Sequence, residues 1–270
     1  MTFRSGNSFE KRHIGPYAAD LQEMLSEVGA RSLDSLMTEI VPAGIRSQVS
    51  PPLPAAEFES EYLDRMKKVA GRNESCRSFI GLGYYGTITP SVILRNVLEN
   101  PGWYTPYTPY QAEVAQGRLE ALLNFQTAVE DLTAMEVANA SLLDEATAAA
   151  EALVLLHRIR SRQQDAGNVF LVSDRCFPQT VEVLRGRAEP LGLDVKMVPE
   201  ARFAFDKSVF GALLQYPDVN GEIRPLGDVI EAAHEAGVLV AVATDLLALT
   251  LLKPPGECGA DVVFGSALRF

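Results

Sequence analysis

The strongest constraint on the fold lies in the second half of the chain, where short apolar runs alternate with helical patterns. Helical patterns cover 178–187 and 225–236, and strand-like runs cover 168–173, 193–198, 209–216, 238–243 and 261–264. Strands separated by helices are typical of a mostly parallel sheet with helices on both faces. The pattern predicts an α/β domain whose ligands lie at the carboxyl ends of the strands. The candidate site residues are those at the ends of the expected strands, namely Ser173, Asp174, Gln215, Tyr216, Pro217, Thr244, Asp245 and Ser266.

The first 75 residues have a different pattern. Helical stripes are expected over about 16–28, 32–40 and 58–69, and a proline-rich connection lies at 51–54. These stripes offer little core of their own. A chain of 270 residues, 47% of them hydrophobic, can form one large α/β domain and an appendage. We therefore expect a helical arm over 1–75 and a large domain over 76–270.

Charge and cysteine usage limit the partners. A net charge of −11, without a basic stripe, makes nucleic acid and anionic membranes poor partners. The three cysteines are far apart, which argues for a reducing compartment and against a zinc site. No apolar run reaches transmembrane length, and residues 1–16 lack the features of a signal or transit peptide. We expect a cytoplasmic protein without a metal, membrane or nucleic-acid site.

Glycine, proline and aromatic residues are concentrated between positions 79 and 110. Tyrosine rings with polar tips suit the wall of a small polar ligand site or a subunit interface. The segment 81–86 also matches the G-x-G-x-x-G pattern of dinucleotide sites, but that pattern requires a helix to open at its last glycine. Here the helical pattern begins only at Pro90. A nucleotide enzyme stays an alternative, and the other explanation is a tight turn that places Tyr84 and Tyr85.

Asp245 is the most informative strand-end residue. A carboxylate at this position in an α/β sheet requires a cation or several donors. One such cation is the pyridinium nitrogen of pyridoxal phosphate. In sites of that kind, a lysine that forms the Schiff base follows the carboxylate residue by about twenty positions. No lysine follows the last strand, and the nearby Arg269 stays protonated and cannot form a Schiff base. Small residues after Asp144 would admit a phosphate at a helix start, although helix propensity explains them equally well.

A series of segments resembles the glycine cleavage system P-protein family, the pyridoxal-phosphate-dependent glycine decarboxylases. The matching segments, in chain order, are RHIGP (12–16), GYYGTITP (83–90), ILRN (93–96), ENP (99–101), WYT (103–105), YTPYQ (107–111), QGRLE (116–120), LNFQT (123–127), ANASLLDE (138–145) and GADVVFGS (259–266). They are in order and spread over nearly the whole chain.

The resemblance implies a fold type I, aspartate-aminotransferase-like large domain, incomplete at its C-terminus. It implies two homologous halves, fused or separate, of which this chain represents the first, with a degenerate cofactor site. Asp245 would be a relic of the pyridinium anchor, and Arg269 would lie near the lost lysine. Pyridoxal phosphate would be held by the second, lysine-bearing half. The resemblance implies no catalytic residue in this chain, and wall residues of the partner's site at Tyr84, Tyr85, Thr87, Tyr107, Tyr110 and Gln111.

The implied reaction is decarboxylation of glycine and transfer of the aminomethyl group to the lipoyl group of H-protein. The implied assembly is at least a dimer of the two halves. Because the chain ends soon after an expected core strand, we expect a fragment that is inactive alone. The alternative is a non-catalytic scaffold that docks the second half or H-protein. Ala134, Ile88 and Leu268 depart from the residues usual in the family, which are Gly, His and Gln.

Overall fold

The computed structural model describes residues 13–47, 49, 51–104, 110–139, 141–162 and 167–270. The chain divides into two compact units, Met1–Arg77 and Ser78–Phe270. The first unit contains three described helices, α2 (Ala18–Glu27), α3 (Leu33–Ile40) and α4 (Glu59–Ala70). Helix α3 begins at Ser32, whose hydroxyl accepts the N–H of Ser35. Leu25 is the one buried hydrophobic side chain among the described residues of this unit. That residues 1–75 serve as a helical arm stays a prediction.

The second unit is built on a five-stranded parallel sheet in the order β2-β1-β3-β4-β5. The strands are β1 (Val169–Ser173), β2 (Asp194–Val198), β3 (Val209–Tyr216), β4 (Leu239–Asp245) and β5 (Val262–Ser266). All eight residues of β3 are buried, as expected for the central strand of a parallel sheet. This confirms the α/β class predicted from the alternating pattern.

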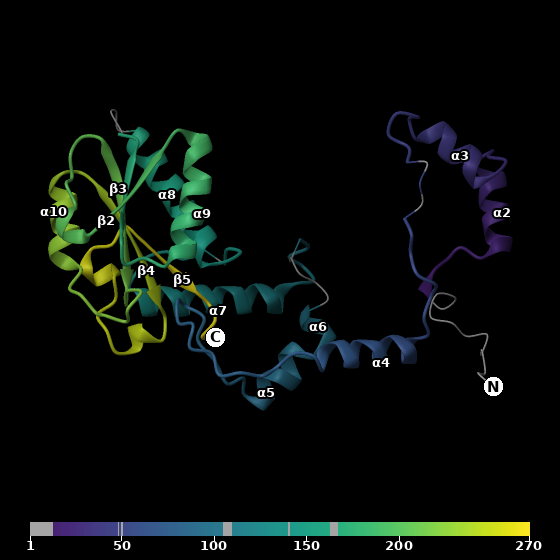
Figure 1. Cartoon of the computed structure of the whole chain (residues 1–270), viewed down its shortest axis with the longest axis horizontal. Helices are drawn as coiled ribbons and strands as arrows, with labels where there is room; N and C mark the ends of the chain where they lie inside the picture. Colours follow the sequence, from purple (N-terminus) through teal and green to yellow (C-terminus); the bar gives the residue numbers. More distant parts are fainter. Residues whose placement is uncertain (1–12, 48, 50, 105–109, 140, 163–166) are drawn as a thin grey trace. The chain divides into compact units, whose positions relative to one another are not determined.

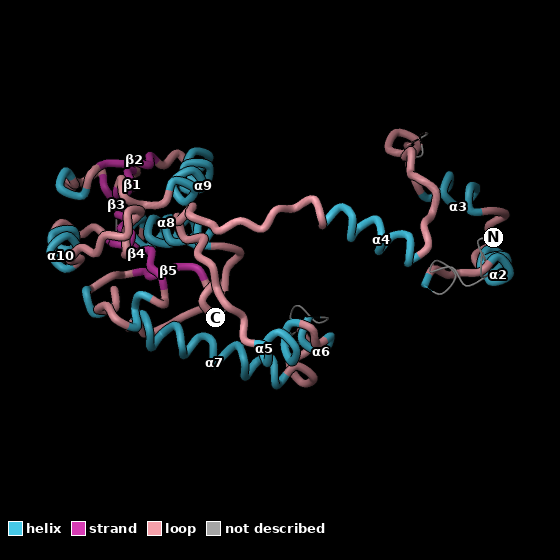
Figure 2. The backbone as a smooth tube through the Cα atoms, turned by 60° about the horizontal axis from the view of Figure 1, so that its bottom comes forward, coloured by secondary structure: helices cyan, strands magenta, loops and turns pink. Residues whose placement is uncertain are grey.

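Helices cover both faces of the sheet. Helices α8 (Glu145–Ser161) and α9 (Pro178–Ala188) lie on one face, and α10 (Gly227–Glu235) lies on the other (Figures 1 and 2). One core cluster joins α8 and α9 to residues such as Phe170, Phe210 and Leu213. A second cluster joins Ile230 of α10 to the opposite sheet face. The two faces of each strand therefore belong to two separate cores.

One long helix, α7, and several short elements complete the second unit. They are α5 (Ser91–Ile93), η1 (Leu94–Leu98), α6 (Pro101–Tyr104), α7 (Gln116–Thr133), η2 (Glu189–Leu191), η3 (Glu200–Arg202), η4 (Ala248–Thr250) and η5 (Gly256–Cys258). Among the described helices, none has the length and apolar character needed to cross a membrane.

Helix α7 ends at Ala134, which has the left-handed backbone conformation, with φ 55° and ψ 35°. A glycine would adopt this conformation without the steric penalty that the Cβ of Ala134 incurs.

Candidate functional site

Asp245 and Arg269 meet at the carboxyl edge of the sheet. Asp245 is the last residue of β4 and pairs in register with Ser266, the last residue of β5. The chain then turns back, so that Arg269 Nε lies 3.0 Å from Asp245 Oδ1 and Nη2 lies 2.9 Å from Oδ2. The two side chains are only 18% and 26% exposed. A two-point pair of this kind fixes both the charge and the plane of the guanidinium.

Tyr85 packs on the other side of the same guanidinium. The Arg269 Cζ atom lies 4.9 Å from the centroid of the Tyr85 ring, within the range of a cation–π contact. The hydrogen bond to Asp245 is the largest influence on Arg269 and raises the pKa of its guanidinium, which burial opposes and Tyr85 reinforces. We call these residues the Asp245–Arg269–Tyr85 cluster.

Glu145, the first residue of α8, shares this electrostatic environment. Burial raises the pKa of the Glu145 carboxyl to about 7, a hydrogen bond with the Gln215 side chain opposes the shift, and the charge of Asp245 adds to it. Gln215 comes from the carboxyl end of β3 and is 5% exposed. At neutral pH the site therefore holds a carboxyl group that can exchange its proton.

The segment 81–85 passes close to Glu145 with an unusual backbone. Gly81, Leu82 and Gly83 have φ values of 67°, 54° and 88°. The Gln179 side chain donates to the Leu82 carbonyl over 2.8 Å. A Cβ on Gly83 would lie 3.1 Å from Phe177 Cε2 and 3.4 Å from Glu145 Oε2. The glycines thus allow a turn and a close approach, as the second explanation from the sequence proposed.

The same geometry contradicts the dinucleotide alternative. Residues 78–80 form no strand, and no helix opens at Gly86. The next helix, α5, begins at Ser91. Without a strand before and a helix after the glycines, no helix N-terminus points at a bound pyrophosphate.

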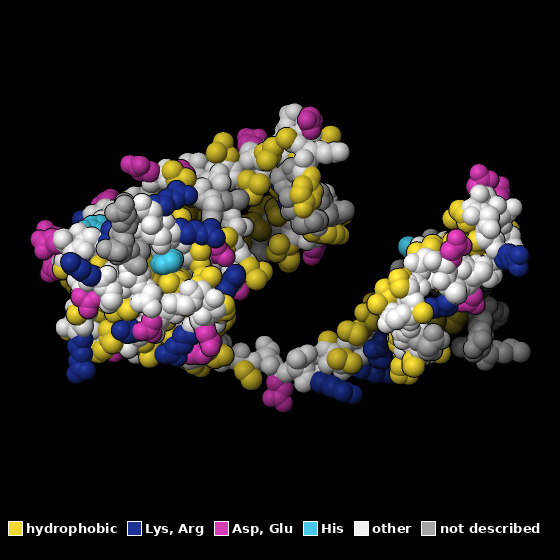
Figure 3. Space-filling model, turned by 90° about the horizontal axis from the view of Figure 1, so that it is seen from above, with side chains coloured by type: hydrophobic (Ala, Val, Ile, Leu, Met, Phe, Trp, Pro, Cys, Tyr) yellow, Lys and Arg dark blue, Asp and Glu magenta, His cyan; other side chains and the backbone are white. Residues whose placement is uncertain are grey.

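A cavity of about 1080 Å³ lies beside these groups. Its walls come from α7, α8, α9, β5 and residues 82–84, and they include Gly83, Tyr84, Glu145, Gln179 and Ser266. Hydrophobic side chains gather around a hollowed face of this unit (Figure 3). The residues that line the cavity are mostly apolar, and carboxyl, amide and hydroxyl groups lie at a few positions.

The structure brings together only part of the wall expected from the sequence. Tyr84 lines the cavity, and Tyr85 belongs to the cluster with Arg269. Thr87, Tyr110 and Gln111 are exposed and do not line this cavity. Tyr107 lies outside the described residues. The roles of all six residues toward a substrate stay predictions.

Two contributors were not identified from the sequence as site residues. Glu145 was expected only as part of a helix start, and Gln179 as part of an ordinary helix. The position of Glu145 directly after the cap residue Asp144 was a usable signal for Glu145. Nothing in the local sequence indicates that Gln179 reaches Leu82, because 97 residues separate them.

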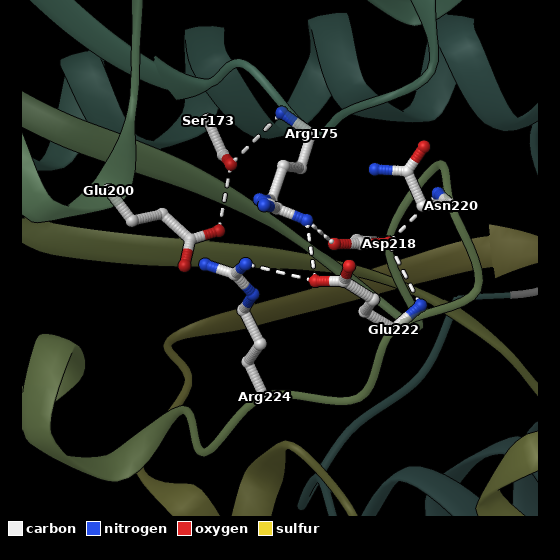
Figure 4. A network of polar contacts seen from close by, with 7 residues as sticks. All are labelled: Ser173, Arg175, Glu200, Asp218, Asn220, Glu222 and Arg224. Carbon is white, nitrogen blue, oxygen red and sulfur yellow. Dashed lines mark hydrogen bonds and ion pairs between the residues drawn. The ribbon is translucent and has the colours of Figure 1, made fainter.

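A second polar network lies at the ends of β1 and β3 (Figure 4). Arg175 Nη1 lies 2.7 Å from Asp218 Oδ2 and 2.7 Å from Glu222 Oε2. Arg224 contacts the same Glu222 oxygen, and the hydroxyl of Ser173 donates to Glu200 over 2.7 Å. Each of the two arginines has a carboxylate partner, so this network ties loops together and leaves no obvious place for an anion.

The residues of this chain do not fit pyridoxal phosphate. The lysines of the second unit are Lys196, Lys207 and Lys253, and none lines the cavity. Asp245, the expected anchor, is already paired with Arg269. At the start of α8, Asp144 Oδ1 accepts the Thr147 N–H over 2.7 Å, and Glu145 follows directly. A phosphate there would meet carboxyl groups instead of free donors.

The comparisons with known proteins agree with one another. The family model described as glycine cleavage system P-protein matches residues 11–270. A glycine dehydrogenase (decarboxylating) from Nostoc sp. (strain PCC 7120 / SAG 25.82 / UTEX 2576) is 54% identical over 264 residues, which are 98% of this chain and 27% of that protein. The enzyme of the same name from Vibrio parahaemolyticus serotype O3:K6 (strain RIMD 2210633) is 56% identical over 264 residues, with the same coverage.

A solved structure gives the same result for the fold. The crystal structure of glycine decarboxylase (P-protein) of the glycine cleavage system, in an inhibitor-bound form, has a TM-score of 0.82 and 34% sequence identity. The match covers 94% of this chain and 58% of that one. The likeness confirms the expected fold class. The chain spans about 27% of the length of the curated relatives that it matches.

Proposed function

Since the chain belongs to the glycine cleavage system P-protein family, we propose that it contributes to a glycine decarboxylase by shaping an active site whose cofactor is held elsewhere in the protein. Pyridoxal phosphate in the lysine-bearing half would act as the electron sink for decarboxylation. The aminomethyl group would pass to the lipoyl group of H-protein. Assembly with the second half, with H-protein as partner and in the cytoplasm, is part of this proposal.

The observation that carries the proposal is the position of Tyr84 and Tyr85. These neighbouring residues come from one constrained turn, and one lines the cavity while the other is stacked on Arg269. Tyr84 is 62% exposed and Tyr85 is 40% exposed, so both rings are accessible to a partner surface. Their hydroxyl groups can donate to a substrate carboxylate, and their rings can exclude water from the reacting groups.

The test combines this chain with the separately expressed remainder of a family member. The measurement is exchange of labelled bicarbonate into glycine, with pyridoxal phosphate and H-protein present. We expect no exchange with this chain alone and exchange in the combination. Exchange by the isolated chain would contradict the assignment of the cofactor to another part.

Three variants then separate a wall role from a scaffold role. Tyr84→Phe and Tyr85→Phe remove one hydroxyl each, and loss of one charge-assisted hydrogen bond corresponds to roughly a tenfold lower rate. Tyr62→Phe is the matched control, since Tyr62 also stacks with an arginine, Arg65, but in the first unit. Full activity in both test variants, with the complex intact, would favour the scaffold alternative.

A further inference from the structure

Arg269 makes the contacts that a planar cationic ligand would make at the end of β4. Its Nε and Nη2 groups donate to the two oxygens of Asp245 over 3.0 and 2.9 Å. The central carbon of its guanidinium, Cζ, lies over the Tyr85 ring, 4.9 Å from the ring centroid. With 18% of its side chain exposed, it is well removed from water.

These contacts match the needs of a protonated pyridine ring. Such a ring requires a carboxylate for its N–H group, an aromatic or apolar surface for its face, and a negative charge nearby. The guanidinium is likewise planar, permanently charged and able to stack on an aromatic ring. The Arg269 side chain therefore makes the contacts that a protonated pyridine ring would make here. It donates to the Asp245 carboxylate, lies against the Tyr85 ring and supplies the positive charge.

We propose that Arg269 is a built-in occupant of this position. It closes Asp245 to planar aromatic cations, and it is a positioning residue that holds the ring of Tyr85. Both claims, that Arg269 occupies the position beside Asp245 and that it holds the Tyr85 ring, concern the fold of this chain alone. Only the effect of Tyr85 on catalysis rests on the proposed function. The structural claims and the proposed function can therefore fail separately.

The chain contains a matched arrangement that serves as the control. In the first unit, Arg65 forms a two-point pair with Glu57, with Nε 2.8 Å from Oε1 and Nη2 2.8 Å from Oε2. Its guanidinium lies 5.3 Å from the Tyr62 ring. These partners are close in sequence, and the arginine and glutamate side chains are 52% and 38% exposed. Loss of Arg65 should free Tyr62 without opening an enclosed position.

The first measurement follows Tyr85 directly. The chain is labelled with 3-fluorotyrosine, and the ¹⁹F signal of Tyr85 is assigned from Tyr85→Phe. We expect Arg269→Gln and Asp245→Asn each to shift and narrow that signal, while Arg65→Gln moves only Tyr62. Arg269→Lys should not restore the wild-type signal, because an ammonium lacks the planar fork. An unchanged Tyr85 signal in both Arg269→Gln and Asp245→Asn would overturn the positioning role.

The second measurement asks whether the position opens. The probe is 4-aminopyridine, a planar cation at neutral pH that bears no aldehyde and cannot react with lysine. Binding is followed through the Tyr85 signal and by calorimetry. We expect binding to Arg269→Ala at least tenfold tighter than to wild type, return of the Tyr85 signal toward its original position, and no such gain in Arg269→Ala/Asp245→Asn. Equal binding to wild type and Arg269→Ala would overturn the occupant role.

A folding defect in Arg269→Ala would not remove the test. Asp245→Asn keeps both side-chain volumes and removes the negative charge that pairs with Arg269 and that also acts on Glu145. If circular dichroism shows that Arg269→Ala is unfolded, the Tyr85 signal in Asp245→Asn decides the positioning role. In that case Arg269→Gly with added ethylguanidinium decides the occupant role, since the added cation should restore folding in that variant and not in Arg269→Gly/Asp245→Asn.

Discussion

Arg175 and Asp218 are 43 residues apart in the sequence and form an ion pair, with Arg175 Nη1 2.7 Å from Asp218 Oδ2. Asp218 is 3% exposed. Its other carboxylate oxygen accepts the backbone N–H groups of Asn220 and Glu222 over 2.8 and 3.0 Å. The pair joins the loop after β1 to the loop after β3, and Val219 N also donates to the Arg175 carbonyl. Both loops belong to the edge of the sheet that carries the candidate site.

Replacement of Asp218 by Asn should therefore lower the stability of the second unit. Burial raises the pKa of Asp218, but the hydrogen bonds from Arg175, Glu222 and Asn220 outweigh it, and the net pKa is lowered. A lowered pKa means that the stabilisation is present above the ordinary value of about 3.9 and is lost as pH falls through the folded-state value. We expect Asp218→Asn to lose about 1–3 kcal/mol at pH 7, measured by urea unfolding, and to show a weaker decline in acid.

Glu182→Gln is the matched control for this prediction. Glu182 pairs with Arg185 at 2.8 Å on the exposed surface of α9, with side chains 70% and 48% exposed. Exposed pairs of this kind contribute about 0–1 kcal/mol. Equal losses in Asp218→Asn and Glu182→Gln would show that burial of the Asp218 carboxylate adds nothing.

Gly83→Ala should disturb the segment that presents Tyr84 and Tyr85. Both Gly81 and Gly83 have positive φ, so alanine costs about 1–2 kcal/mol at either position. At Gly83 the added Cβ also meets the buried Phe177 ring at 3.1 Å, whereas at Gly81 nothing lies within 4 Å. We expect a larger loss of thermal stability in Gly83→Ala than in Gly81→Ala, with displaced tyrosine signals only in the former. Equal behaviour of the two variants would be the contrary result.

Glu145→Gln should make stability less dependent on pH. The pKa of Glu145 is raised to about 7 in the folded chain, against about 4.3 in the unfolded chain. The folded chain holds the extra proton between these values, so the contribution of Glu145 to stability is present below the unfolded value and is lost as pH rises through 7. Glutamine stays neutral, and we expect the variant to gain stability relative to wild type between pH 5 and 8, on the order of 1–3 kcal/mol.

Urea unfolding at several pH values checks the Glu145 prediction. Glu120→Gln, on the exposed surface of α7, is the control and should parallel wild type. A Glu145→Gln curve that parallels wild type across this range would show that Glu145 is ionised well below neutral pH.

Ala134→Gly should stabilise the chain. Ala134 is exposed and ends α7 in the left-handed conformation, which costs a residue with a Cβ about 1–2 kcal/mol. Glycine removes this cost at the loss of some entropy in the unfolded state, so a net gain of about 1 kcal/mol is expected. Ala121→Gly, inside the same helix, should instead destabilise by about 1 kcal/mol. Calorimetric melting compares the two, and a lower melting temperature for Ala134→Gly would contradict the backbone argument.

Much of the fold was predictable from local patterns. Strand β3 was expected at 209–216 and lies at Val209–Tyr216, because a continuous apolar run between turn residues has few other outcomes in an α/β chain. The apolar spacing over about 111–133 predicts one long helix, but α7 begins at Gln116 and not at Gln111. Residues 111–114 form turns instead. Helix starts depend on which residue supplies the first cap contacts, and the segment before α7 offers no strong capping residue.

By itself, the sequence determined the α/β class, the order of the elements and the family. These properties follow from residue types and their spacing along the chain, which periodicity and motif order report directly. Only the tertiary structure decided that Arg269 pairs with Asp245 and lies against the Tyr85 ring, and that burial raises the pKa of the Glu145 carboxyl to about 7. Those facts depend on distances and burial between residues far apart in sequence, and such distances exist only once the sheet has brought its strand ends to one edge.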